Sequence, residues 1–411
     1  MLLRPVKRLF AEPPEAPPTM RSPSPAPMGE PASPKAPCTD EQPDARETRK
    51  GGGPRVAEAR PYGTSSAHEM AGVPDAARER ALARVGTSLG SKWRLDALLA
   101  IGGAAAVYRG THRNGLKGAV KVLHAELARD RDFVQRFLRE GYAANQVGHP
   151  GAVKVLDDNA TPDGVQYLVM ELLEGESLER LLARTGPLDE SFVLWVAGEV
   201  LPVLAAAHGK GIIHRDIKPE NLFYTSARDV RVLDFGVARM KDPAYGIAAT
   251  TSRHVMGTPA YMAPEQARGR WEQVDATSDL WALGATMYAL LTGRLLREAK
   301  TRTEELMLAM TVPVPSLAQL VPGLSPDVVA IVDRALSFDR TRRFPSARAM
   351  HEAVREALLA RGLRGPVAPV HAYRHATAPA SGSVSALHFL PASLGAESIE
   401  PVSSSPLLEE C

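Results

Sequence analysis

Four polar residues with complementary chemistry lie in two short stretches of the sequence, "HRDIKPEN" and "DFG". The first stretch holds Asp216, Lys218 and Asn221, and the second begins at Asp234. Transfer of a phosphoryl group from ATP needs an acceptor for the proton of the attacking hydroxyl, a cation, and oxygen ligands for Mg²⁺. Asp216 and Lys218 supply the first two, and Asn221 with Asp234 supplies oxygens of the kind that Mg²⁺ prefers. The spacing of these residues therefore predicts phosphoryl transfer.

The two stretches resemble the motifs of the protein kinase family, in particular the eukaryotic-like (Hanks-type) serine/threonine kinases of bacteria. The resemblance implies that ATP and Mg²⁺ are the cofactors, with Mn²⁺ as an alternative metal. It places Lys121, in "GAVKVL", on the α- and β-phosphates of ATP, and it makes Glu140 the acid that orients Lys121 through an ion pair. Gly118 stands where the family usually has valine, and we expect it to weaken strand packing slightly.

The stretch "LLAIGGAAAVYRG" stands where the family has its glycine-rich phosphate-binding loop, but alanines replace some glycines. The resemblance assigns nucleotide contacts to Leu99, Ala100, Ile101, Gly102, Gly103, Ala104, Ala105, Ala106 and Val107. Ala100 and Ala105 take the first and third glycine positions, and Gly102 takes the second. A methyl group costs about 1 kcal/mol where φ must be positive, and almost nothing elsewhere. We therefore expect the alanines to weaken ATP binding by about tenfold at most.

Two further stretches resemble the family's adenine-binding and substrate-binding segments. In "YLVMELLEG", Met170 is expected at the back of the adenine pocket, and the backbones of Glu171 and Leu173 are expected to bind the purine. "GTPAYMAPEQ" together with "KPEN" resembles serine/threonine rather than tyrosine kinases. The resemblance also implies structural contacts, in which Thr258 bridges to Asp216 and Lys218, Asp279 anchors the catalytic loop, and Arg343 pairs with Glu265.

A polar stretch between Asp234 and Glu265, "GIAATTSRHVMG", has the length of a regulatory loop. It offers Thr250, Thr251 and Ser252 as phosphate acceptors, and Arg215 is expected to pair with such a phosphate and order the loop. The sequence predicts autophosphorylation here. It leaves open whether two copies associate transiently to carry it out.

The fold class expected for this pattern is α+β, with a strand-rich lobe followed by a helical lobe. Short segments rich in Val, Leu and Tyr predict strands up to about residue 170, interrupted by one helix over 130–148. Helical patterns dominate after residue 175. The kinase domain is expected at 93–359, with the first lobe at about 93–170 and the second at about 176–359. His208, Trp195 and Trp281 lie in apolar helical runs and are expected in the core.

Both ends of the chain have the composition of disordered segments. Residues 1–88 hold Pro-rich stretches such as "EPPEAPPTMRSPSPAP", and residues 361–411 are rich in Pro, Ser and Ala. Such segments bury too little apolar surface to offset their ordering entropy. A short helical pattern, "PDAARERALARV", is the exception near the start of the globular part.

Composition excludes several classes of protein. The 49 basic and 47 acidic residues nearly balance, which gives no reason to expect a nucleic-acid or membrane partner. Since no apolar run reaches about 18 residues, we expect no membrane span. Cys38 and Cys411 lie in the segments predicted to be disordered, which argues against a disulfide framework and favours the cytoplasm.

Other interpretations fit the sequence less well than an active enzyme that phosphorylates proteins. A pseudokinase, acting as a nucleotide-binding scaffold, is the alternative, but the residues expected to do the chemistry are all present. A small-molecule phosphotransferase would lack "GTPAYMAPEQ" and the helices after it. A dinucleotide-binding fold would need alternating strands and helices after the small-residue loop, and the sequence shows none.

Overall fold

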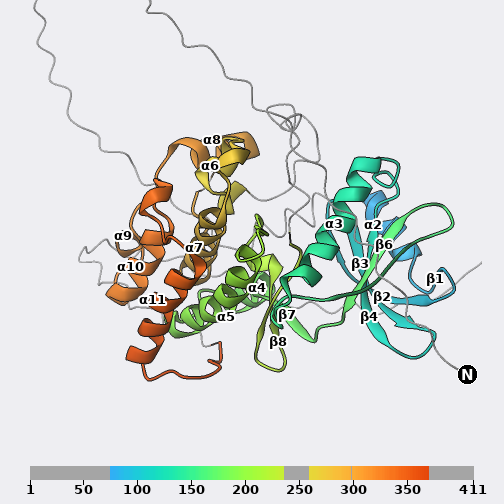
Figure 1. Ribbon diagram of the computed structural model, residues 1–411, viewed down its shortest axis with the longest axis horizontal. Coiled ribbons are helices and arrows are strands. Elements are labelled where there is room, and N and C mark those ends of the chain that lie inside the picture. The colour runs from blue at the N-terminus through green and yellow to red at the C-terminus, as the bar shows by residue number, and fades with distance from the viewer. Residues whose placement is uncertain (1–74, 236–258, 298, 370–411) are drawn as a thin grey trace, which may run out of the picture. The chain divides into compact units, whose positions relative to one another are not determined.

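The computed structural model describes residues 75–235, 259–297 and 299–369. Within this part of the chain, strands β1–β6 lie together with helices α2 and α3, and helices α4–α11 gather in a second group (Figure 1). Buried apolar residues form two clusters, one centred on the sheet and one on the helices of the second group, and the end of α3 belongs to the second cluster. This arrangement confirms the predicted α+β architecture of a strand-rich lobe followed by a helical lobe.

A six-stranded antiparallel sheet with the order β1-β2-β3-β4-β6-β5 forms the first lobe. Its strands are β1 (Ser88–Leu89), β2 (Trp93–Ile101), β3 (Ala105–His112), β4 (Lys117–Leu123), β5 (Val155–Ala160) and β6 (Gln166–Glu171). Side chains alternate between the faces of a strand. Val120 and Val122 are therefore buried in the core on one face of β4, while Lys121 points to the other face.

Helix α3 (Arg131–Val147) carries Glu140 and confirms the helix predicted over 130–148. Asp130 caps its start by accepting hydrogen bonds from the N–H groups of Asp132 and Phe133. Gly148, with φ of 64°, ends the helix in the left-handed region that favours glycine. A Cβ on Gly141 would lie 2.7 Å from Cδ1 of Leu168, so the missing side chain lets α3 approach β6 closely.

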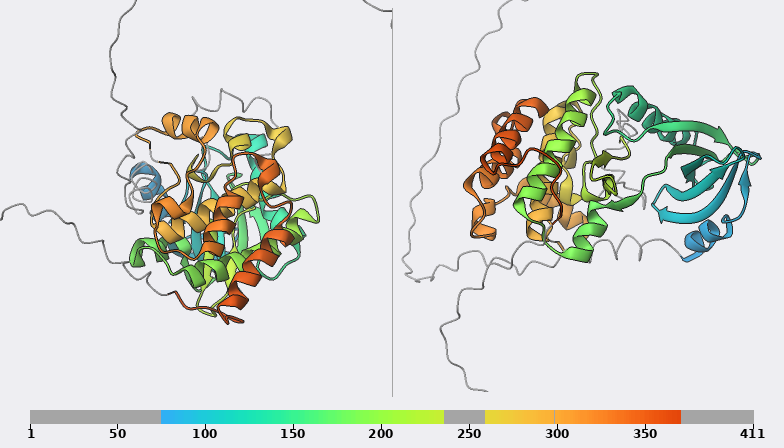
Figure 2. Two further views of the ribbon diagram at one scale, coloured as in Figure 1. Left: turned by 90° about the vertical axis from the view of Figure 1, so that its left-hand side faces the viewer. Right: turned by 90° about the horizontal axis from the view of Figure 1, so that it is seen from below.

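The folded part of the chain begins earlier than the sequence analysis expected, because part of the segment 1–88 is ordered. Helix α2 (Asp75–Ala83) and strand β1 pack on the first lobe, where Figure 2 shows the helix in blue. Ala81 is 4% exposed, and its carbonyl accepts a 3.0 Å hydrogen bond from the buried hydroxyl of Tyr108. The prediction of disorder over 75–88 is therefore corrected, since these residues bury apolar surface and complete an edge of the sheet.

Gly118 does not weaken strand packing as expected. A Cβ at this position would lie 2.9 Å from Cγ1 of Val169 and 3.1 Å from the ring of Trp93. Both neighbours are almost fully buried, so neither has room to move aside. The absence of a side chain at Gly118 therefore allows Trp93 to pack across the sheet.

The second lobe is built mainly from helices around the buried pair α5 and α7. Its helices are α4 (Leu178–Thr185), α5 (Glu190–His208), α6 (Pro264–Ala267), α7 (Ala276–Thr292), α8 (Arg302–Thr311), α9 (Leu317–Leu320), α10 (Pro326–Ala335) and α11 (Ala347–Ala360). A small antiparallel sheet of β7 (Gly175–Ser177), β8 (Leu222–Thr225) and β9 (Val230–Val232) lies beside α4 and α5. Trp195 and Trp281 are buried in this lobe, as predicted.

Helix α5 has the length and hydropathy of a membrane span, but most of its apolar window is buried inside the protein, as in the core helix of a globular lobe. At the other end of the lobe, residues 361–369 continue past α11, and Val367 packs against the helical core. This start of the segment 361–411, predicted to be disordered, therefore has a packing contact. Residues 370–411 and 1–74 lie outside the described part of the chain.

Candidate active site

The buried carboxylate of Asp279 anchors the backbone of the loop that carries Asp216, as the sequence analysis expected. Oδ2 of Asp279 accepts a 2.8 Å hydrogen bond from the N–H of His214, and Oδ1 accepts a 2.7 Å bond from the N–H of Arg215. His208 adds a 2.8 Å contact from Nε2 to Oδ2 of Asp279, a polar role that its apolar sequence context did not reveal. Burial lowers the pKa of His214, with the Asp279 carboxylate opposing the shift.

Asp216, Lys218 and Asn221 meet at the end of this loop. Asn221 lies in a 3-10 turn, Pro219–Asn221, and its Nδ2 donates to the carbonyl of Asp216 at 2.7 Å and to Oδ2 of Asp216 at 3.1 Å. Nζ of Lys218 lies 3.9 Å from the same Oδ2. Because the amide nitrogen of Asn221 is committed to Asp216, its oxygen is the group left to bind a cation.

Lys121 joins the two lobes through charged contacts. Its Nζ lies 2.7 Å from Oδ1 of Asp234 and 3.5 Å from Oε1 of Glu140, which confirms the ion pair expected with Glu140. Burial acts to lower the pKa of Lys121, but the two carboxylates more than offset it and raise this pKa above its usual range. A cavity of about 20 Å³ lies beside these three residues and is also lined by Met170. Met170 therefore lies near the residues expected to bind the phosphates.

The small-residue loop is a tight turn between two strands. Leu99, Ala100 and Ile101 end β2, and Ala105, Ala106 and Val107 begin β3, so only Gly102, Gly103 and Ala104 form the turn. Positive φ among the described non-glycine residues occurs at Ser91, Arg215, Arg228 and Asp234. Ala100 and Ala105 therefore have ordinary backbone conformations in which a methyl group costs little. This geometry supports the prediction that the alanines are compatible with nucleotide binding.

The segment after β6 offers backbone groups at the mouth of the cleft. The N–H of Glu171 donates to the carbonyl of Lys154 at 3.0 Å, which leaves the carbonyl of Glu171 as its candidate purine contact. No backbone hydrogen bond joins Leu173 to another residue in the described part of the chain. Its N–H and carbonyl are therefore available for hydrogen bonds with the edge of a purine.

The pair of Glu265 and Arg343 is present as predicted. The carboxylate of Glu265 accepts bidentate hydrogen bonds of 2.8 Å and 2.9 Å from Arg343 and a 2.6 Å bond from Ser278. Burial alone would raise the pKa of Glu265, but the hydrogen bonds and charge of Arg343 lower it. The pair fixes the segment that follows the predicted regulatory loop.

Several predicted residues lie outside the described ranges, namely Gly236, Thr250, Thr251, Ser252 and Thr258. Other contacts near the site had no signal in the sequence. Nε2 of His124 contacts the carbonyl of Gly102 at 2.8 Å, and an exposed arginine of α4, Arg180, donates to the carbonyl of Leu99 at 3.4 Å. These are contacts between side chains and backbone across the fold, and no motif spacing encodes them.

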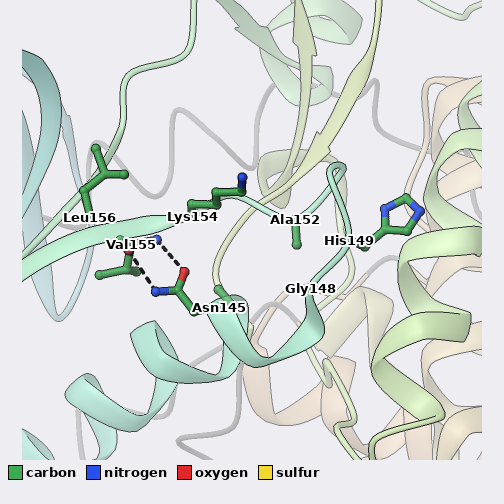
Figure 3. Close-up of a pocket in the computed structure, with 8 residues that line it drawn as sticks. Asn145, Gly148, His149, Ala152, Lys154, Val155 and Leu156 are labelled. Atoms are coloured by element: carbon green, nitrogen blue, oxygen red, sulfur yellow. Dashed lines mark hydrogen bonds between the residues drawn. The ribbon is translucent and has the colours of Figure 1, made fainter. Parts of the chain in front are cut away.

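The larger cavity, of about 230 Å³, lies at the end of α3 and shares two lining residues with the small cavity beside Lys121 (Figure 3). It is lined by α3 and by the segment that leads to β5. The amide of Asn145 closes one side by pairing with both backbone groups of Val155, at 2.8 Å and 2.9 Å (Figure 3). Since Lys121, Asp216 and Asp234 do not line this cavity, the candidate active site is the cleft between the lobes.

The fold and the cleft define a phosphotransferase class, and comparison with known proteins gives the family. The protein kinase domain family matches residues 93–355. This chain belongs to the protein kinase family.

Among its relatives, the chain is 39% identical over 273 residues to the serine/threonine-protein kinase pkn3 of Myxococcus xanthus, covering 64% of this chain and 50% of that protein. It is 40% identical over 279 residues to Pkn1 of Myxococcus xanthus, covering 67% and 39% of the two chains. It is 36% identical over 273 residues to PknB of Mycobacterium tuberculosis, covering 64% and 42%. The match thus spans half or less of each of these relatives.

Solved structures agree with this assignment. The kinase domain of PknI from Mycobacterium tuberculosis is 26% identical and superimposes with a TM-score of 0.52, covering 66% of this chain and 98% of that domain. The predicted resemblance to bacterial Hanks-type kinases and the predicted fold are therefore confirmed.

Proposed function

We propose that this protein transfers the γ-phosphoryl group of ATP to serine or threonine hydroxyls of protein substrates. The observation that carries the proposal is that Lys121 and Glu140 of the first lobe meet Asp234 of the second lobe, and that the residue before Asp234 is hydrogen-bonded to Asn221, the partner of Asp216. Relatives named as serine/threonine kinases support the substrate class. No observation favours a pseudokinase scaffold.

Each side chain has a task that its geometry suits. Asp216 accepts the proton of the substrate hydroxyl, and the hydrogen bond from Nδ2 of Asn221 keeps its carboxylate in place. Lys218, near the same carboxylate, stabilises charge on the transferring group. Lys121 holds the phosphates of ATP, while Glu140 keeps the Lys121 ammonium in position.

Members of the family use a divalent metal ion, and the donor set here fits Mg²⁺, with Mn²⁺ as the alternative. The amide oxygen of Asn221 and the carboxylate of Asp234 are hard oxygen ligands, and two protein groups are typical because Mg²⁺ keeps several waters. A bound divalent ion supplies positive charge to the phosphates. The purine is proposed to bind the backbones of Glu171 and Leu173 beneath residues 99–107.

The proposal extends to regulation and location. Autophosphorylation at Thr250, Thr251 or Ser252, with or without transient self-association, is supported by the sequence pattern and by the placement of Arg215 directly before Asp216. A cytoplasmic location is proposed because the two cysteines lie in segments predicted to be disordered, which argues against a disulfide framework. Substrates are expected to be proteins.

Asp216→Asn tests the catalytic assignment. Loss of the proton acceptor should lower phosphoryl transfer from radiolabelled ATP by a factor of about 10² to 10⁴. Thermal unfolding should change little, because asparagine keeps an oxygen for the Asn221 contact. Asp339→Asn, at a half-exposed aspartate of the second lobe, is the matched control and should keep full activity. Equal incorporation by Asp216→Asn and the wild type would remove Asp216 from the mechanism.

A further inference from the structure

Three hydrogen bonds hold the turn Gly102–Ala104 at its two ends. The N–H of Gly102 donates to the carbonyl of Ala105 at 2.8 Å, which closes the turn. The N–H of His124 donates to the carbonyl of Ala104 at 2.9 Å, which extends the ladder between β3 and β4 by one step. The ring of His124 adds a third bond, from Nε2 to the carbonyl of Gly102 at 2.8 Å. Since a carbonyl only accepts, Nε2 carries the proton.

This third bond fixes the orientation of one peptide group. In a trans peptide the C=O and the following N–H point in opposite directions. With the Gly102 carbonyl turned toward His124, the N–H of Gly103 points away from His124. The N–H groups of Gly103 and Ala104 have no backbone acceptor within the described part of the chain. They are therefore available to a ligand.

The face toward which the Gly103 N–H points is the face of Lys121. Side chains alternate along a strand, so residues three positions apart lie on opposite faces. Lys121 faces Glu140 and Asp234 in the cleft, and continuing the alternation of β4 one residue past its end at Leu123 puts His124 on the opposite face. A carbonyl held on the His124 face thus directs the Gly103 N–H toward the Lys121 ammonium and the phosphates that the ammonium holds.

We propose that His124 is a positioning residue for the nucleotide, holding the Gly102 carbonyl so that the Gly103 N–H is aimed at the phosphate oxygens before ATP binds. Gly102 and Gly103 have no side chains to fix the turn, and neither has a positive φ. An anchored turn loses less entropy when it binds phosphate, which strengthens binding. The inference rests on the proposed function, since it concerns the triphosphate of ATP.

The test compares His124→Ala with His124→Gln, whose amide nitrogen retains a donor at a similar distance from the backbone. His124→Ala should raise the Kd for ATP and the KM for ATP by about threefold to tenfold, the effect of one hydrogen bond. The Kd for adenosine and the KM for the protein substrate should not change. His124→Gln should restore most of the ATP affinity. His112→Ala, at the other end of β3, is the histidine control and should bind ATP normally.

A second measurement does not depend on activity. In the protein without nucleotide, the amide of Gly102, whose bond to the Ala105 carbonyl closes the turn, should exchange with solvent faster in His124→Ala than in the wild type or His124→Gln. Equal exchange, or an equal Kd for ATP in His124→Ala and the wild type, would overturn the role of His124. A wild-type protein that binds adenosine and ATP equally well would instead overturn the proposed function.

Discussion

The guanidinium of Arg297 is buried without full hydrogen bonding. Arg297 is 7% exposed, and its Nη2 donates to the carbonyl of Val312 at 3.2 Å. Its Nε and Nη1 have no hydrogen-bond partner among the residues that the structure describes, although the charge of Glu305 acts on the guanidinium. Burial lowers the pKa of Arg297 to about 10, so the group remains charged at neutral pH. It lies 5.5 Å from the ring centre of Trp281, whose ring is also contacted by Arg343, at 4.9 Å.

Arg297→Met should therefore stabilise the protein by about 1 kcal/mol, because it removes an incompletely paired buried charge and keeps a contact with the indole. Thermal unfolding should show a midpoint higher by about 2 °C. Arg343→Met is the matched control on the same tryptophan. It should destabilise by about 3 kcal/mol or more, because it leaves the buried carboxylate of Glu265 unpaired. A lower midpoint for Arg297→Met would contradict this account.

At the scale of elements, helix α2 and strand β1 extend the first lobe beyond the residues that the kinase family matches. Ala81 faces the sheet and is 4% exposed, whereas its neighbour Leu82 is 50% exposed. Arg80 reaches Glu126, in the connection between β4 and α3, at 2.8 Å. The helix therefore contacts the segment that leads into α3.

Ala81→Glu and Leu82→Glu test this docking with one kind of substitution on one helix. Glutamate at position 81 would place an unpaired carboxylate against the sheet, which costs about 2 kcal/mol, so α2 should detach. Hydrogen exchange over residues 75–89 should then rise and the unfolding midpoint should fall. Leu82→Glu should stay within about 0.5 kcal/mol of the wild type. If both variants behave alike, α2 does not dock through Ala81.

At the scale of the whole molecule, Lys210 connects the end of α3 with the turn that precedes the catalytic loop. Its Nζ donates to the carbonyls of Gln146 and Val147 at 2.8 Å and 2.9 Å. A Cβ on Gly148 would lie 3.0 Å from this Nζ, so the glycine leaves room for the ammonium. A cation at a helix C-terminus is favourable. The contact ties the helix of Glu140 to the loop of Asp216.

Lys210→Met should lower kcat by about fivefold, the effect of about 1 kcal/mol, because α3 can then shift relative to the catalytic loop. Lys210→Arg keeps two donors and should retain most of the activity. Lys154→Met is the control, since the described residues give the side chain of Lys154 no ion pair or hydrogen bond (Figure 3). Steady-state kinetics with saturating ATP measures the effect. A kcat for Lys210→Met equal to that of Lys154→Met would show that the tether has no role.

The sequence by itself determined the reactive groups and their local framework. "HRDIKPEN" places Asp216, Lys218 and Asn221 within one short loop, where chain connectivity alone keeps them close. Helical and strand periodicity predicted α3 and the two lobes, because these patterns depend on near neighbours. The pairs of Lys121 with Glu140 and of Arg343 with Glu265 followed from resemblance to the family and were confirmed.

Only the tertiary structure decided the contacts that depend on packing between distant segments. Lys121 and Asp234 are 113 positions apart, yet their atoms meet at 2.7 Å because the two lobes bring β4 and the end of β9 together. The docking of α2, the need for glycine at position 118 and the His124 contact have no local signature, since each depends on which surfaces the sheet presents. Whether an alanine fits the phosphate-binding turn depended on φ, and φ is fixed by the register of β2 with β3.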